Sequence, residues 1–138
     1  MTRFDGLSLV VFSGGFDRVH YALSMAAAAA ATGRPVSLLV SGRAVRALLP
    51  EGWRDLDPAD DGSAPAERDR LFAARGIATF GELLEACAAL EVRVIVCEMA
   101  LRSLGMSSET PFRHDVPATV GGIVTFLESA AGGDIVFV

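Results

Sequence analysis

Short runs of apolar residues recur along the chain, and longer segments with helical spacing separate them. An apolar run of roughly four to eight residues, bounded by turn-forming residues, is typical of a strand buried on both faces of a sheet. Such runs predict four strands, over residues 7–12, 36–40, 92–96 and 135–138.

The segments between these runs carry residues that begin and end helices. Asp17 can cap a first helix that runs to about Thr32 and stops at Gly33. A short helix is expected over residues 43–49. Another opens at Thr79-Phe-Gly-Glu82, which fits the capping-box pattern.

Two more helices are expected in the second half of the chain. One covers residues 98–104 and ends at Gly105. The other begins at Pro117, which suits the first turn of a helix, and contains Gly121-Gly122. Each of these glycines lowers helix stability by roughly 1 kcal/mol relative to alanine, so we expect a close packing contact there.

Apolar strands that alternate with helices favour a parallel sheet joined by right-handed crossovers. The 138 residues are enough to bury one hydrophobic core. We therefore expect a single α/β domain over residues 1–138. It should be a three-layer sandwich with a mainly parallel sheet and helices on both faces.

Residues 50–67 differ from the rest of the chain because they are rich in acidic residues, glycine and proline. The acidic residues are Glu51, Asp55, Asp57, Asp60, Asp61 and Glu67. We expect an acidic surface loop here rather than a metal site. Trp53 stands out within it, and either pins the loop to the body of the protein or lies on a subunit interface.

The charge of the chain excludes several classes of function. The formal net charge is −5 and the pI is about 4.9, whereas nucleic acid and anionic membranes require a basic face, so we expect neither as a partner. All twelve basic residues are arginine. The lack of lysine rules out a Schiff base, a P-loop lysine and a lysine general base.

Two cysteines without a signal peptide favour free thiols in a reducing compartment. Residues 1–5 lack an apolar secretory core, and the longest weakly polar run, residues 19–31, is too short to span a bilayer. We expect a cytoplasmic protein without a membrane segment.

Three segments follow the predicted strands at the edge where parallel sheets bind ligands, outside the carboxyl ends of the strands. Backbone N–H groups and helix dipoles at this edge can hold an anion or a thiolate. The candidate binding residues are Ser13, Gly14, Gly15, Asp17, Arg18, Ser41, Gly42, Arg43 and Glu98, and the candidate catalytic residue is Cys97.

Cys97 ends the third predicted strand, and we expect any chemistry to centre on it. A helix N-terminus or a nearby arginine lowers the pKa of a cysteine from about 8.5 to roughly 3.5–7.5, and Arg18 and Arg43 are the candidate cations. Glu98 would raise the pKa of the thiol by like-charge repulsion. The alternative is that Cys97 is a buried, inert residue of the core.

Cys87 and the two histidines are weaker candidates. Cys87 shares a helix face with leucines, which favours packing, and it would lie roughly 16 Å from Cys97 along the sheet, beyond disulfide reach. His20 in the first helix and His114 in the loop before Pro117 either share the site or are structural. These residues have no metal-ligand spacing, so we expect no metal, and no cofactor is implied.

Three segments carry a more specific signal. They are Ser-Gly-Gly-Phe-Asp-Arg at residues 13–18, a Cys-Glu-Met segment within residues 94–106, and Val-Gly-Gly-Ile-Val-Thr-Phe-Leu at residues 120–127. Together they resemble the DsrE/DsrF-like family, most closely the branch labelled peroxiredoxin-like. That branch has Ser-Gly-x-x-Asp-Lys, Cys-x-Met and Val-Gly-Gly-Val-Ala-Thr-Tyr-Leu, so Arg18 stands where it has lysine. The resemblance covers most of the chain except residues 50–75.

This resemblance implies a parallel α/β sandwich that forms homo-oligomers, as dimers, trimers or hexamers. It also implies that the cysteine matching Cys97 carries sulfane sulfur as a persulfide. A sulfur-donor or sulfur-acceptor protein would then be a partner.

Two other functions compete with sulfur relay. One is a non-catalytic oligomer that binds a small ligand or a partner and in which Cys97 is structural. The other is a thiol peroxidase, which the sequence disfavours. No Pro-x-x-x-Thr-x-x-Cys pattern surrounds Cys97, and no resolving cysteine is within reach.

Overall fold

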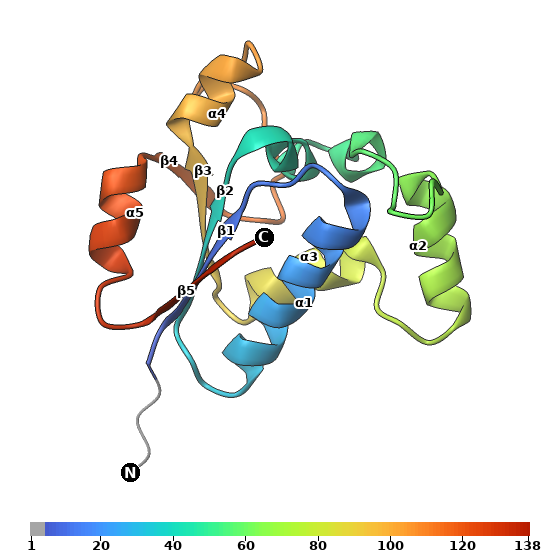
Figure 1. Ribbon diagram of the computed structural model, residues 1–138, viewed down its shortest axis with the longest axis horizontal. Coiled ribbons are helices and arrows are strands. Elements are labelled where there is room, and N and C mark those ends of the chain that lie inside the picture. Colours follow the sequence, from blue (N-terminus) through green and yellow to red (C-terminus); the bar gives the residue numbers. More distant parts are fainter. Residues whose placement is uncertain (1–4) are drawn as a thin grey trace.

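The computed structural model describes residues 5–138 (Figure 1). Residues 1–4, which belong to the N-terminal segment assessed for a secretory signal, lie outside the described residues. The elements in chain order are β1 (Leu7–Val11), α1 (Phe16–Ala31), β2 (Val36–Val40), the 3-10 helices η1 (Gly42–Leu48) and η2 (Gly52–Asp55), α2 (Pro65–Ala74), α3 (Phe80–Ala89), β3 (Arg93–Cys97), α4 (Glu98–Ser103), β4 (Ala118–Gly121), α5 (Ile123–Ser129) and β5 (Asp134–Phe137).

The five strands form one sheet in the order β4-β3-β2-β1-β5, and every neighbouring pair is parallel. The chain adds strands in one direction from β1 to β4 and then returns to the far side of β1. Right-handed crossovers that run in opposite directions place their helices on opposite faces. Accordingly, α1 and α3 cover one face, and α5 lies across the sheet from them (Figure 1). The expected α/β fold with helices on both faces is confirmed.

The core lies mainly between the sheet and α1 and α3. Side chains of β1, β2 and β3 that point to this side are buried against the apolar faces of the two helices. The small alanines of α1, such as the buried Ala22 and Ala26, let this helix lie close to the strands. The expected stop of α1 is also confirmed, because Gly33 has a φ of +91°, a conformation that glycine adopts easily.

The helix predicted from Pro117 is wrong in its first half. Residues Ala118–Gly121 form β4 instead, and α5 begins only after Gly122. β4 pairs with β3, and this pairing satisfies the backbone hydrogen bonds of these residues. A helix through Gly121 and Gly122 would be less stable, because glycine lowers helix stability. The close contact expected at the two glycines exists at Gly121 only. A Cβ on Gly121 would lie 3.0 Å from Ile95 Cγ2, whereas a Cβ on Gly122 would meet nothing within 4 Å.

Residues 50–67 are more than a surface loop. They contain η2 and the start of α2, a helix that was not predicted. The ring of Trp53 is buried and stacks on Phe80 with ring centroids 5.6 Å apart, and it also contacts Phe16. Trp53 therefore pins this segment to α1 and α3, which is the first of its two predicted roles.

The N-terminus of α1 differs from the prediction. Gly15, not Asp17, is the N-cap residue, and no side chain caps the helix. Asp17 lies in the first turn, where its carboxylate accepts a hydrogen bond from the backbone N–H of Asp60 at 2.9 Å and faces Arg68 at 3.4 Å. The capping box of Thr79 and Glu82, by contrast, is confirmed at the start of α3.

Across residues 5–138, none of the helices combines the length and the apolar character that crossing a bilayer requires.

Candidate functional site

Cys97 is the last residue of β3 and the N-cap residue of α4. Val94 of the same strand lines the apolar cavity between the sheet and α1 and α3. Because side chains alternate along a strand, Ile95 and Cys97 belong to the opposite face, the one on which α5 packs. Cys97 pairs in register with Gly121 of β4, and its exposed fraction is only 1%.

A pocket of about 220 Å³ reaches Cys97 from the surface. Its walls come from α4 and from the first turn of α5, two helices that begin at the carboxyl ends of the neighbouring strands β3 and β4. The lining residues are Cys97, Glu98, Met99, Arg102, Gly122, Ile123 and Val124. We call this the Cys97 pocket. It is apolar on the α5 side and carries one acidic and one basic residue on the α4 side.

The charged residues of the Cys97 pocket form an ion pair one helical turn apart. Arg102 Nη2 donates to Glu98 Oε1 at 2.6 Å, and both side chains are more than half exposed. The predicted neighbour Glu98 is therefore present beside Cys97, and its negative charge is partly balanced by Arg102.

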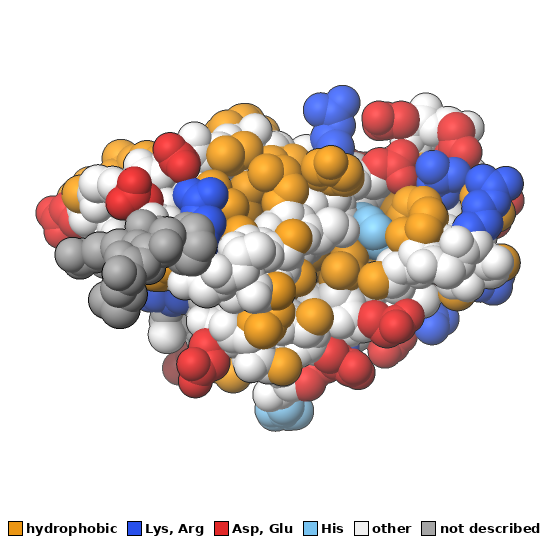
Figure 2. All heavy atoms as spheres, turned by 90° about the horizontal axis from the view of Figure 1, so that it is seen from below, with side chains coloured by type: hydrophobic (Ala, Val, Ile, Leu, Met, Phe, Trp, Pro, Cys, Tyr) orange, Lys and Arg blue, Asp and Glu red, His pale blue; other side chains and the backbone are white. Residues whose placement is uncertain are grey.

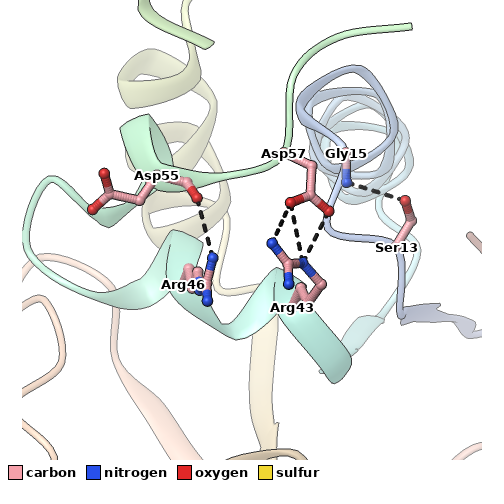
Figure 3. Close-up of polar contacts among 6 residues, drawn as sticks. All are labelled: Ser13, Gly15, Arg43, Arg46, Asp55 and Asp57. Carbon is pink, nitrogen blue, oxygen red and sulfur yellow. Dashed lines mark hydrogen bonds and ion pairs between the residues drawn. The ribbon is translucent and has the colours of Figure 1, made fainter. Parts of the chain in front are cut away.

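The structure does not bring Arg18 or Arg43 to the Cys97 pocket. Arg43 donates from Nε to both carboxylate oxygens of Asp57, at 3.1 and 3.0 Å, and also from Nη2 (Figure 3). These contacts raise the pKa of the Arg43 guanidinium, first through the hydrogen bond to Asp57 and then through its charge. Arg18 is exposed on α1. The cation beside Cys97 is Arg102 instead.

The glycine-rich loop after β1 binds the acidic segment of the chain itself. Asp57 N–H donates to the carbonyl of Gly14 at 2.8 Å, and the N–H of Phe16 donates to the carbonyl of Asp57 at 3.0 Å. Gly15 N–H donates to Ser13 Oγ at 3.2 Å (Figure 3). The N–H groups of Gly15 and Phe16, which were expected to face an anion, are thus engaged within the chain.

Close packing explains why glycine stands at residue 14. A Cβ there would lie 2.5 Å from Arg43 Cβ and 2.8 Å from Asp57 Oδ2. One turn further along η1, Arg46 Nη1 reaches the carbonyl of Asp55 at 3.5 Å (Figure 3). Two arginines of η1 therefore hold the segment that contains Asp55 and Asp57 against the carboxyl edge of the sheet.

Ser41 and Gly42, at the end of β2, pack against the end of the neighbouring strand β1 and the residue that follows it. Ser41 is buried, and its N–H donates to the carbonyl of Val11 at 2.9 Å. Gly42 has a φ of +49°, and a Cβ there would lie 2.6 Å from the carbonyl oxygen of Phe12. Glycine is needed here for both reasons, and neither residue lines the Cys97 pocket.

The two histidines lie apart from Cys97. His20 is buried among aromatic rings, with its ring centroid 4.5 Å from that of Phe72, and its Nε2 lies 2.8 Å from the carbonyl oxygen of Ala78. His114 is exposed and lines a different pocket, with Pro50. Neither belongs to the Cys97 pocket.

Cys87 has the surroundings of a packing residue. It lines the apolar cavity under α1 and α3, and its Sγ lies 3.7 Å from the carbonyl oxygen of Leu23. Burial raises the pKa of this thiol from 9.0 to about 11. Within residues 5–138, no group of three or more His, Cys, Asp or Glu side chains is arranged to hold a metal ion.

Sequence reasoning missed Arg102 and the α5 residues of the pocket. The spacing of Glu98 and Arg102, four residues apart on a predicted helix, was a usable signal, because such pairs face each other on a helix. No comparable signal existed for Ile123 and Val124, since the helix predicted from Pro117 did not start where α5 starts.

Comparisons with known proteins give a family from the sequence and a fold from solved structures. The model of the DsrE/DsrF-like family matches residues 9–138. Two similar solved structures are the ychN protein from E. coli and MTH1491, a protein of unknown function from Methanobacterium thermoautotrophicum. The first has a TM-score of 0.59 and 16% identity and covers 96% of this chain and 99% of its own. The second has a TM-score of 0.59 and 14% identity, and the match covers 99% of this chain and 100% of the MTH1491 chain. Among curated proteins nothing matches.

Proposed function

The chain belongs to the DsrE/DsrF-like family, and on this premise we propose that it carries sulfane sulfur as a persulfide on Cys97 and relays it to an acceptor thiol. The observation that carries the proposal is the position of Cys97. It ends β3 at the carboxyl edge of a parallel sheet, where ligand sites form, and it lines a surface pocket.

The reaction is a thiol exchange in two steps. The Cys97 thiolate attacks the outer sulfur of a donor persulfide, R–S–SH. A bond forms between Cys97 Sγ and that sulfur, the S–S bond of the donor breaks, and its electron pair leaves on R–S⁻. An acceptor thiolate then attacks the outer sulfur of the Cys97 persulfide in the same way, which returns the Cys97 thiolate.

The placement of the second cysteine supports relay over internal disulfide formation. Cys87 lines the cavity on the opposite face of the sheet. A persulfide on Cys97 therefore has no thiol within its own chain that could resolve it into a disulfide. Its outer sulfur would persist until a thiol from another molecule enters the pocket.

The homo-oligomer is also part of this proposal. Large apolar side chains stand exposed on α5 and β5, among them Leu127 at 50% and Phe137 at 69%, and Phe12 stacks on Phe137 with centroids 5.8 Å apart. Apolar side chains also gather at the middle of the face in Figure 2, with charged ones towards the rim. Exposed apolar surface of this kind favours association with another copy of the chain.

One observation favours the alternative of a non-catalytic, partner-binding oligomer. With an exposed fraction of 1%, Cys97 presents little surface to a reactant, as a structural cysteine would. The two functions differ in whether a small reagent in the pocket can reach the sulfur of the folded protein.

Mass spectrometry after incubation with a small persulfide donor tests the proposal. We expect a gain of about 32 Da, one sulfur atom, on the peptide that contains Cys97. Cys97→Ser should abolish the gain, whereas Cys87→Ser should keep it. Sulfur found on Cys87 alone would contradict the proposal. A Cys97 that resists alkylation in the folded state and reacts once unfolded would favour the alternative.

A further inference from the structure

We propose that Arg102 selects the sulfur donor, by binding the carboxylate of a small anionic persulfide whose outer sulfur Cys97 takes; this inference rests on the proposed function. Of residues 5–138, Arg102 is the only basic residue that lines the Cys97 pocket. It stands on α4, one turn after Glu98, whereas Cys97 lies at the start of the same helix.

Most N–H donors of the Arg102 guanidinium are not used in hydrogen bonds to the described residues. Its single hydrogen bond among the described residues runs from Nη2 to Glu98 Oε1. A guanidinium carries five N–H donors in a planar fork that matches a carboxylate. Nε and Nη1 of Arg102 therefore remain available to a ligand, and the side chain is 77% exposed, so a ligand can reach them.

A second pocket extends the site beyond this ion pair. It has a volume of about 260 Å³ and is lined by Glu98 and Arg102 together with Leu101, Met106, Ser107, Ser108 and Val120. Glu98 and Arg102 thus border both pockets. A carboxylate bound by Arg102 would lie where the linings of the two pockets meet.

The charges around the site define the class of donor. The chain has a net charge of −5, which repels anions in general, so an anionic donor needs a local cation. Glu98 competes with the donor for Arg102, but an exposed ion pair contributes little stability and is readily exchanged. Met99, Ile123 and Val124 offer apolar contacts to the carbon chain of the donor.

Two small disulfides of similar length and opposite charge test this selectivity. Dithiodiglycolate carries two carboxylates and cystamine carries two ammonium groups. In each case the Cys97 thiolate attacks one sulfur, a mixed disulfide forms, the reagent's S–S bond breaks, and the other half leaves as a thiolate. Mass spectrometry follows the rate at which each reagent modifies Cys97. The ratio of the dithiodiglycolate rate to the cystamine rate is then compared between each variant and the unaltered chain.

We expect Arg102→Gln to lower the ratio of dithiodiglycolate to cystamine rates by roughly two- to fivefold. Arg102→Lys should retain most of the preference, and Glu98→Gln should raise it. Arg54→Gln is the matched control, because Arg54 is also exposed and paired with an acidic residue, Glu51 at 3.1 Å, outside the pocket. The control should leave the ratio unchanged.

The outcomes separate the role of Arg102 from the sulfur relay itself. If Cys97 reacts but Arg102→Gln and Arg54→Gln change the ratio equally, the role of Arg102 is overturned and the sulfur relay stands. If neither reagent modifies Cys97 in the folded protein, while both do after unfolding, the sulfur relay fails and the role of Arg102 fails with it.

Discussion

Cys87 and Cys97 lie on opposite faces of the same parallel sheet. Cys87 reaches the sheet from α3 and lines the apolar cavity beneath α1, whereas Cys97 ends β3 and lines a surface pocket against α5. The sheet therefore separates the two thiols, which predicts different behaviour for each.

The first prediction concerns the order of alkylation. Burial raises the pKa of the Cys87 thiol to about 11, so very little of it is the reactive thiolate at pH 7. Both cysteines have an exposed fraction of 1%, and they differ in that a surface pocket reaches Cys97. We expect iodoacetamide to modify Cys97 roughly tenfold faster than Cys87 or more in the folded protein. Peptide mapping over time checks this. Equal rates in the folded state, or Cys87 reacting first, would contradict the arrangement described.

The second prediction concerns alkaline pH. Burial raises the pKa of Cys87 in the folded state to about 11, above its ordinary value of 9.0. Because the folded state favours the neutral thiol, Cys87 contributes to the free energy of unfolding. This contribution is complete below pH 9 and is lost as the pH rises towards 11. The loss should not exceed about 3 kcal/mol.

Chemical denaturation between pH 8 and pH 11 measures this loss. Cys87→Ala should show a shallower decline of the free energy of unfolding over that range, whatever its stability at pH 8. The same slope in both proteins would show that other groups cause the decline.

The third prediction concerns Gly14 and Gly15. A Cβ on Gly14 would overlap Arg43 Cβ and the carboxylate of Asp57, whereas the nearest contact of a Cβ on Gly15 is 3.5 Å from Ser13 Oγ. We expect Gly14→Ala to lower the free energy of unfolding by roughly 1–3 kcal/mol and Gly15→Ala to change it less. Urea denaturation at pH 7 compares the pair, and a larger loss for Gly15→Ala would refute the packing explanation.

The fourth prediction concerns the exposed apolar side chains of α5 and β5. If another copy of the chain covers them, Leu127→Asp and Phe137→Asp should each shift the protein to a smaller assembly in analytical ultracentrifugation, because an unpaired charge would be buried at the interface. Tyr21→Asp is the matched control, since Tyr21 is 66% exposed on α1, on the other face of the sheet. An assembly that only Tyr21→Asp disrupts would place the interface on α1.

Much of the fold follows from local patterns in the sequence. The strands β1, β2 and β3 are nearly continuous apolar runs. The capping box at Thr79 needs only residues three apart, so neighbours along the chain suffice to predict all four features. Cys97 was predicted at a strand end for the same reason. β4 was missed because Ala118–Gly121 is only four residues long and contains Thr119 and Gly121, and its strand conformation depends on pairing with β3.

The site itself was decided by contacts between distant segments. The sequence indicated that Cys97 ends a buried strand beside Glu98, because both facts are local. The tertiary structure shows that Arg102, and not Arg18 or Arg43, is the cation beside Cys97, and that α5 lies next to it. It also shows that the backbone of Asp57 bonds to the glycine-rich loop after β1. Each depends on how strands pair and which way the chain crosses the sheet, and these are set by the packing of the whole chain, not by residues near one another in the sequence.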